Sequence, residues 1–193
     1  MRDLHNYLAP ENFHGSSGLR RTSRWLAKER MSTSHFDNLV RSRWGSFRLA
    51  RLQSWLEQTE LATHSVLLHG FASLGVLLPP ILTTTTEFLI GADIAAGRPE
   101  VDLGWLLGEL AEVARTTCRE IVDFDELSRL LLQGYGPGYN EIALGRIAVL
   151  RMVTHLHDYA TYVEWNADCV RHADFLVDLI DDEGRSTLPG RTM

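Results

Sequence analysis

Cysteine is scarce in this chain of 193 residues, and the two cysteines that occur, Cys118 and Cys169, lie far apart in the sequence. They form neither a Cys-x-x-Cys pair nor the dense pattern of a disulfide-stabilised secreted domain. We interpret both as packing residues, because a free cysteine behaves as a small apolar side chain. The cysteine content therefore predicts a protein of the reducing cytoplasm.

Targeting and membrane-spanning segments are also missing from the sequence. The first residues lack the apolar core and the small-residue cleavage site of a secretory signal. The longest uncharged stretch, 65–86 with histidine counted as neutral, is interrupted by Gly70, Gly75, Pro79 and Pro80. A membrane span needs about 20 mostly apolar residues in succession. We therefore expect neither export nor a transmembrane helix.

Three common sequence signals are absent as well. No stretch alternates apolar and polar residues as a half-buried strand does, and no internal repeat occurs. The glycine-rich stretch Gly134–Tyr139 lacks the lysine and the Ser/Thr of a phosphate loop, so it predicts a turn. No local grouping of Ser, His and Asp indicates a hydrolytic triad.

Helical spacing of apolar residues is what the sequence does contain. It predicts helices over 36–78, 84–96, 103–122, 123–133 and 139–180. The first of these is one long helix or two consecutive ones, ended by Pro79 and Pro80. The predicted fold is therefore all-α, a bundle of four to five helices with two long helices, whose facing interiors are suited to a ligand or metal site.

The charges divide the chain unevenly and suggest its organisation. Residues 1–56 hold ten basic and four acidic residues, while the remainder holds nine basic and 21 acidic residues. We predict a mobile basic N-terminal arm (1–33), a helical bundle domain (34–183) and a flexible tail (184–193), with Met31 as an alternative start. The arm would lie on the acidic body of its own or a neighbouring chain, so we expect no nucleic-acid binding.

Glu60 and His64 form the first candidate site. On a continuous helix, which turns 100° per residue, both fall in the apolar stripe that contains Leu56, Leu67 and Phe71. A buried carboxylate needs a partner or a strongly raised pKa. An inward-facing Glu-x-x-x-His pair is one element of a dinuclear carboxylate site, and we take both residues as candidate catalytic residues. The alternative is a buried pair that fixes the helix register.

The last predicted helix provides a second candidate site. One flank carries Glu164, Asp168 and His172, one per turn, as potential metal ligands. The other flank carries residues suited to contacting an organic ligand, namely Met152, His155, Tyr159, Tyr162 and Asn166. The alternative is that the acidic flank is an ordinary solvated helix edge.

The Glu-x-x-x-His and Asp-x-x-x-His pairs resemble the ligand pairs of helical di-metal oxygenases, the ferritin-like and haem-oxygenase-like bundles. The resemblance covers these few positions, and the spacing differs from the Glu-x-x-His pairs of ferritin-like proteins. It implies a centre of iron or another transition metal, held by Glu60, His64, Asp168 and His172 and bridged by Glu87 or Glu164.

The leading hypothesis is a cytoplasmic helical enzyme that oxidises a small organic substrate at such a metal centre, with Tyr159 and Tyr162 lining the pocket. Haem is an alternative cofactor, since His69 beside the small Gly70 could act as an axial ligand. A further alternative is a non-enzymatic homodimer formed through an apolar helix face, whose basic arm binds an acidic partner or nucleic acid. In either case we expect a homo-oligomer.

Overall fold

A computed structural model describes residues 1–27, 34–60, 65–78, 87–116 and 123–191. These residues are mostly helical, which confirms the predicted all-α class. Their helices are α1 (Arg2–His5), α2 (Ser17–Leu26), α3 (His35–Glu60), α4 (Glu100–Thr116), α5 (Phe124–Tyr135), α6 (Glu141–Tyr162) and α7 (Ala167–Asp181), with short 3-10 turns η1 (Leu74–Val76) and η2 (Arg185–Thr187). No helix in the described ranges is long and apolar enough to cross a bilayer.

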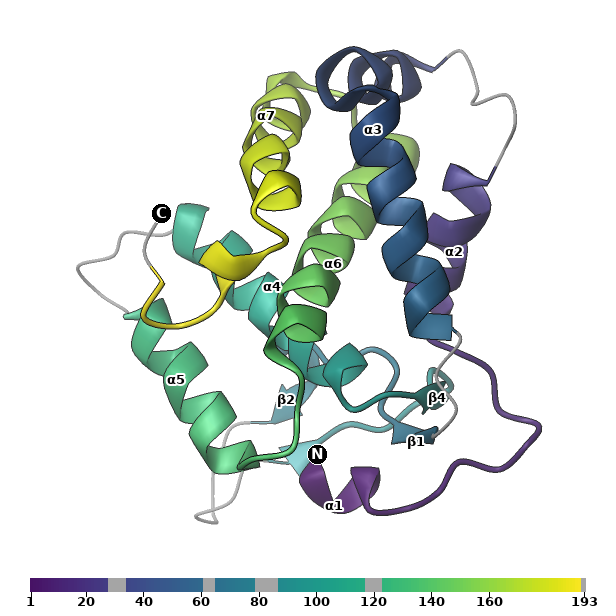
Figure 1. Cartoon of the computed structure of the whole chain (residues 1–193), viewed down its shortest axis with the longest axis vertical. Coiled ribbons are helices and arrows are strands. Elements are labelled where there is room, and N and C mark those ends of the chain that lie inside the picture. The colour runs from purple at the N-terminus through teal and green to yellow at the C-terminus, as the bar shows by residue number, and fades with distance from the viewer. Residues whose placement is uncertain (28–33, 61–64, 79–86, 117–122, 192–193) are drawn as a thin grey trace.

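Helix α6 forms the centre of the bundle, and α2, α3, α4 and α7 all pack against it (Figure 1). Its middle section is buried on every side, from Ile147 to Thr154. The two longest helices are α3, with 26 residues, and α6, with 22 residues. Gly45 interrupts α3 with a left-handed backbone (φ 67°), so the helix bends there.

The closest helix contact joins α4 and α6. A side chain at Gly108 would place its Cβ 2.5 Å from the carbonyl oxygen of Ala148. Gly104, one turn earlier, faces Leu144 and Ile147 at similarly short range. Glycine is therefore required at both positions, because any side chain would push the two backbones apart.

Two small antiparallel sheets lie below the helices. Strand β1 (Val66–Leu68) pairs with β4 (Ala95–Gly97), and β2 (Leu77–Leu78) pairs with β3 (Glu87–Phe88). Where the structure describes these segments, it corrects the predicted helices over 61–78 and 84–96. The strands contain only two or three residues each, too few to show alternation, and their conformation depends on pairing between segments distant in sequence.

The described part of the arm predicted over 1–33, residues 1–27, packs into the fold. Trp25 is buried in the core, and its indole N–H donates to Asp37 at 2.9 Å. His5 is also buried, with Nε2 3.0 Å from Asp102 Oδ2 on α4. The basic composition concealed this packing, because the arginines of α2 face outward while its apolar side chains face the bundle.

The predicted C-terminal elements need two corrections. The long helix over 139–180 is divided into α6 and α7, because Asn166 starts α7 by accepting hydrogen bonds from the N–H groups of Asp168 and Cys169. The described part of the tail predicted over 184–193 is packed at Thr187 and Leu188, which are buried, while Gly190 and Arg191 are exposed. Both features depend on local capping and on contacts that helical periodicity does not reveal.

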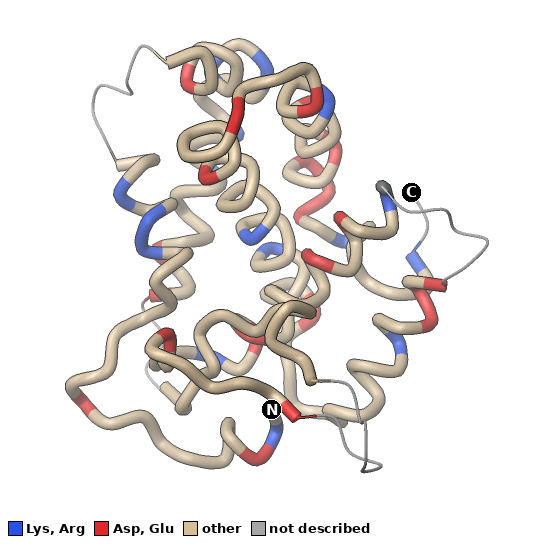
Figure 2. Tube along the Cα trace, turned by 180° about the vertical axis from the view of Figure 1, so that it is seen from behind, with Lys and Arg blue, Asp and Glu red and all other residues tan. Residues whose placement is uncertain are grey.

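Basic residues early in the chain form ion pairs with acidic residues later in the chain. Arg43 and Arg48 on α3 pair with Asp174 and Asp181 on α7, at 3.3 and 2.5 Å. Arg21 on α2 likewise reaches Asp158 on α6. Figure 2 shows basic and acidic residues interspersed along the helices rather than collected into two halves of the molecule. The basic first segment therefore pairs with the acidic body of its own chain.

Replacing Gly108 with Ala should lower the free energy of unfolding by about 1–3 kcal/mol, because the added methyl group meets the α6 backbone. Gly134→Ala on α5 is the matched control. A Cβ at Gly134 would have no neighbour within 4 Å, so this change should stabilise the protein by up to about 1 kcal/mol through helix propensity. Urea denaturation measures both. Equal effects of the two substitutions would contradict the close α4–α6 contact.

Candidate functional site

A cluster of charged and imidazole side chains lies where α4, α6 and α7 meet, and we call it the polar centre. Its members are Glu109 and Glu112 from α4, Arg151 and His155 from α6, and His172 from α7. Glu112 and Arg151 are buried, each with 8% of its surface exposed. Charged residues are rarely buried to this extent unless they are paired.

Glu112 is the hub of the polar centre. One carboxylate oxygen forms an ion pair with Arg151. The other lies 2.8 Å from His155 Nδ1 and 3.4 Å from His172 Nε2. Glu109 extends the group, since its Oε2 accepts a hydrogen bond from the N–H of Leu74 at 2.7 Å. The cluster therefore connects three helices to the turn η1.

The two histidines of the polar centre differ in their surroundings. Half of the His155 side chain is exposed (51%), whereas 20% of the His172 side chain is exposed. His172 Nε2 is a buried atom without a hydrogen-bond partner in the described residues, because its contact with Glu112 lacks hydrogen-bond geometry. His155 therefore reaches solvent, while His172 closes the inner side of the cluster.

Both imidazoles are held in the neutral form. Burial, and then the positive charges of Arg115 and Arg151, lower the pKa of His172 to about 4. The pKa of His155 is also lowered, by desolvation of the ring atoms that pack against the protein and by the charge of Arg151. At neutral pH both rings are unprotonated and can accept a proton.

Tyr159, predicted to line a substrate pocket, lies beside the polar centre. Its ring meets the ring of His155 in an edge-on contact, with the centroids 6.4 Å apart. Its hydroxyl lies 3.5 Å from the side-chain nitrogen of Asn166. Tyr162, predicted for the same role, is 71% exposed at the end of α6. The structure thus brings Tyr159, His155 and His172 together and leaves Tyr162 on the surface.

Glu60 does not share a site with Asp168 and His172. Helices α3 and α7 run in the same direction (Figure 1), since Arg43 pairs with Asp174 and Arg48 pairs with Asp181. Glu60 follows Arg48 by twelve residues, and His172 precedes Asp181 by nine. At about 1.5 Å per residue, Glu60 and His172 are on the order of 30 Å apart along the helices. A single metal centre cannot include both.

The other predicted ligands are dispersed. Glu60 is exposed at the end of α3, where it lines a cavity of about 440 Å³, and His64 lies outside the described residues. Glu87 on β3, Glu164 between α6 and α7, and Asp168 are exposed. No group of three or more His, Cys, Asp or Glu side chains in the described ranges is arranged to hold a metal ion.

His69, the candidate haem ligand, is engaged within the fold. It follows β1 and is buried, with Nε2 2.7 Å from the carbonyl oxygen of Leu89. Its backbone N–H donates to Asp102 at 2.7 Å, and that of Gly70 donates to the same carboxylate at 2.9 Å. These bonds attach the turn after β1 to α4, which gives His69 a structural role.

Glu112 and Arg151 are the central residues that sequence reasoning missed. Arg151 stands in a run of apolar residues, with Leu150 and Met152 as neighbours and all three buried. A charged residue inside such a run predicts a buried partner of opposite charge. That signal was available in the sequence, although it does not identify Glu112 as the partner.

Comparison with known proteins gives no further assignment: no family model, curated protein or solved structure matches the chain. The function must therefore be argued from the chemistry of the polar centre.

The low pKa of His172 predicts a loss of stability in acid. Between about pH 6.5 and pH 4 the unfolded chain binds a proton at this residue and the folded chain does not, so the free energy of unfolding falls as the pH decreases, by up to about 3 kcal/mol. His172→Asn should remove much of this pH dependence, whereas His14→Asn, at an exposed loop position, should retain it. Urea denaturation across this range measures the difference. Parallel curves for wild type and His172→Asn would contradict the assignment.

Proposed function

We propose that the protein is an enzyme that uses the Glu112–His155 pair as a general base on a small organic substrate. The observation that supports it is the 2.8 Å contact between Glu112 Oε1 and Nδ1 of a half-exposed histidine. Buried carboxylates orient catalytic histidines in this way in many enzymes. The proposal keeps the helical enzyme inferred from the sequence and places its chemistry on residues that lie together.

In this proposal each group of the polar centre has a role. An ionised carboxylate can only accept hydrogen bonds, so the His155 proton is on Nδ1 and Nε2 carries a lone pair. The ion pair with Arg151 holds the Glu112 carboxylate in place. The lowered pKa of His155 leaves this lone pair free at neutral pH. Tyr159 supplies an aromatic surface beside it for the apolar part of a substrate.

Hydrolysis of a small ester is the simplest reaction that fits this arrangement. His155 Nε2 takes a proton from a water molecule, and the resulting hydroxide adds to the ester carbonyl. The bond from that carbon to the alcohol oxygen then breaks, and the alkoxide takes the proton back from His155. The products are a carboxylic acid and an alcohol, so no oxidant or metal is consumed in the cycle.

His155→Gln should reduce the hydrolysis of para-nitrophenyl acetate at least about tenfold, since general-base catalysis usually contributes more than this. His14→Gln, on an exposed loop, is the control for reaction at any surface imidazole. The wild-type rate should rise with pH through an apparent pKa below the ordinary value for histidine. Equal rates for the two variants, or an apparent pKa at the ordinary value, would refute the proposal.

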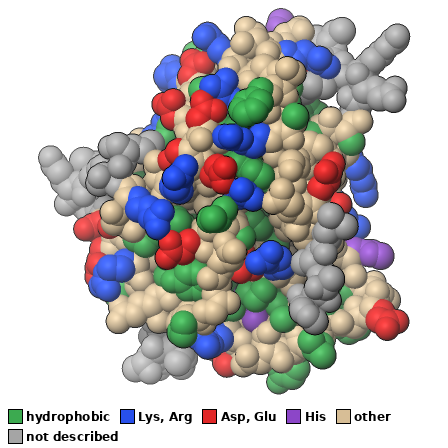
Figure 3. Space-filling model, in the orientation of Figure 1, with side chains coloured by type: hydrophobic (Ala, Val, Ile, Leu, Met, Phe, Trp, Pro, Cys, Tyr) green, Lys and Arg blue, Asp and Glu red, His purple; other side chains and the backbone are tan. Residues whose placement is uncertain are grey.

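A second candidate, self-association, is favoured by exposed apolar residues on the strand side of the molecule. Tyr7, Leu8, Leu89 and Ile90 have exposures of 65, 81, 52 and 56%. Tyr7 and Leu89 are both hydrogen-bonded to the β1 region, through Leu67 and His69. In Figure 3 hydrophobic side chains reach the surface at this lower end. Large exposed apolar surfaces commonly mark interaction sites, and two copies of one face suit a symmetric dimer.

If this face joins two copies, Leu89→Glu should convert a dimer into a monomer, because it would bury two carboxylates at the interface. Val163→Glu is the control, since Val163 is 71% exposed at the far end of α6. Light scattering after size-exclusion chromatography measures the mass. A monomeric wild-type protein at high micromolar concentration would eliminate this candidate and leave the enzyme proposal unaffected.

A further inference from the structure

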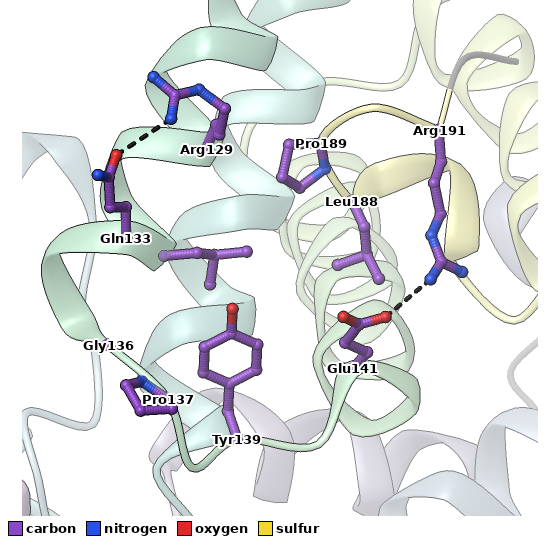
Figure 4. A pocket seen from close by; sticks show the side chains of 10 residues that line it. Arg129, Gln133, Gly136, Pro137, Tyr139, Glu141, Leu188, Pro189 and Arg191 are labelled. Atoms are coloured by element: carbon purple, nitrogen blue, oxygen red, sulfur yellow. Dashed lines mark hydrogen bonds and ion pairs between the residues drawn. The ribbon is translucent and has the colours of Figure 1, made fainter.

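A cavity of about 490 Å³ lies between α5, the turn after it and the C-terminal segment, away from the polar centre (Figure 4). We call it the Tyr139 cavity. Its apolar lining comes from Leu132, Pro137, Leu188, Pro189 and the ring of Tyr139. Its polar lining comes from Arg129, Gln133, Glu141 and Arg191. A cavity of this size and composition suits a small organic molecule.

Contacts of the C-terminal segment with α5 and α6 hold the walls of the cavity in place. The N–H of Gly190 donates to Asp125 on α5 at 2.9 Å. Arg191 reaches Glu141, the first residue of α6, at 2.7 Å. Leu188 is buried against the core with 5% exposure. The C-terminal segment is therefore attached on both sides of the opening, and the cavity exists before any ligand enters.

The polar groups around the cavity are not equally available to a ligand. Arg129 donates twice to Glu126, at 2.6 Å each, and once to Gln133, so its guanidinium is largely occupied. Among the described residues the Arg191 side chain contacts Glu141 alone, and this contact uses one of its five donors. The Tyr139 hydroxyl points into the cavity in Figure 4 and has no hydrogen-bond partner among the described residues.

We propose that the Tyr139 cavity binds a small organic anion with an apolar body. The body lies against Pro137, Pro189 and the ring of Tyr139, above the buried Leu132 and Leu188. Its carboxylate pairs with Arg191, sharing the guanidinium with Glu141. Tyr139 donates its free hydroxyl to a polar atom of the ligand. Arg191 favours an anion, because its guanidinium has donors beyond the one bonded to Glu141, whereas the charge of Arg129 is paired with Glu126.

Phenylpropionate is a suitable probe, and its neutral amide and phenethylamine are matched analogues. Titration of the full-length chain, followed by calorimetry or NMR, should show saturable binding of the carboxylate with a dissociation constant of about 1 mM or below. The amide should bind at least about fivefold more weakly, since it loses the charge-assisted contact with Arg191. The amine should bind more weakly still.

Substitutions inside and outside the lining test whether the ligand binds in this cavity. Arg191→Gln should weaken the carboxylate to the level of the amide and leave the amide unchanged, while Arg185→Gln, outside the cavity lining, should change neither. Gln133→Trp places an indole at the rim from an exposed position and should abolish binding. Leu130→Trp, exposed on the same helix but outside the lining, should not.

Several results would overturn the proposal. They are the absence of saturable binding to the wild type, equal binding of acid, amide and amine, preference for the amine, or binding that survives Gln133→Trp. None of these depends on hydrolytic activity, so the cavity and the polar centre are tested separately.

Discussion

The close approach of α4 to α6 is the constraint on which the rest of the structure depends. Gly104 faces Ile147 and Gly108 faces Ala148, so the two helices run side by side in the same direction. One turn after Gly108 comes Glu112, which this register places opposite Arg151 and His155. The small residues therefore position the polar centre as well as the helices, because any increase in spacing would separate the carboxylate from its partners.

That arrangement places opposite charges where little water can reach them. Taking a carboxylate and a guanidinium out of water is costly, and their attraction compensates only when the geometry is good and the remaining polar atoms are satisfied. Glu112 meets this condition through Arg151 and His155, whereas His172 Nε2 remains without a hydrogen bond in the described residues. A buried ion pair of this kind is weak evidence for added stability. In the proposed function it would hold the carboxylate in place beside the accessible imidazole of His155.

The sequence predicted features that depend on local chemistry. It gave the helical class, the segments now seen as α4 and α5, and the turn at Gly136 and Gly138, whose positive φ angles only glycine adopts easily. It missed β1 and β4, whose pairing joins residues about 30 positions apart. It also missed the break before α7, although an asparagine at position 166 is a favourable N-cap. The helical spacing of apolar residues continues across that break, because α6 and α7 both present an apolar face to the same core.

The candidate site was predicted only in part, and for a related reason. His172, His155 and Tyr159 were recognised because they are polar or aromatic residues on a helix with a clear apolar face. Glu112 was not, because its importance comes from its register against α6, which is set by Gly108 and Ala148. The pair predicted at Glu60 and His64 depended on a helix that continues past Glu60. Glu60 is the last described residue of α3 and its side chain is exposed, while His64 lies outside the described residues.

Helix α6 contributes residues to both proposed sites. We nevertheless expect ligand binding in the Tyr139 cavity to have little effect on the polar centre. Glu141, at the Tyr139 cavity, and His155 are fourteen residues apart, or about 21 Å along the helix. This exceeds the screening length of about 8 Å at physiological salt, so an exposed anion near Glu141 has little influence on the charge of His155. The section of α6 between these two positions is buried from Ile147 to Thr154, so it separates the two sites with packed side chains. A ligand in the cavity would therefore stabilise the folded state through its own binding energy and leave the chemistry of the polar centre unchanged.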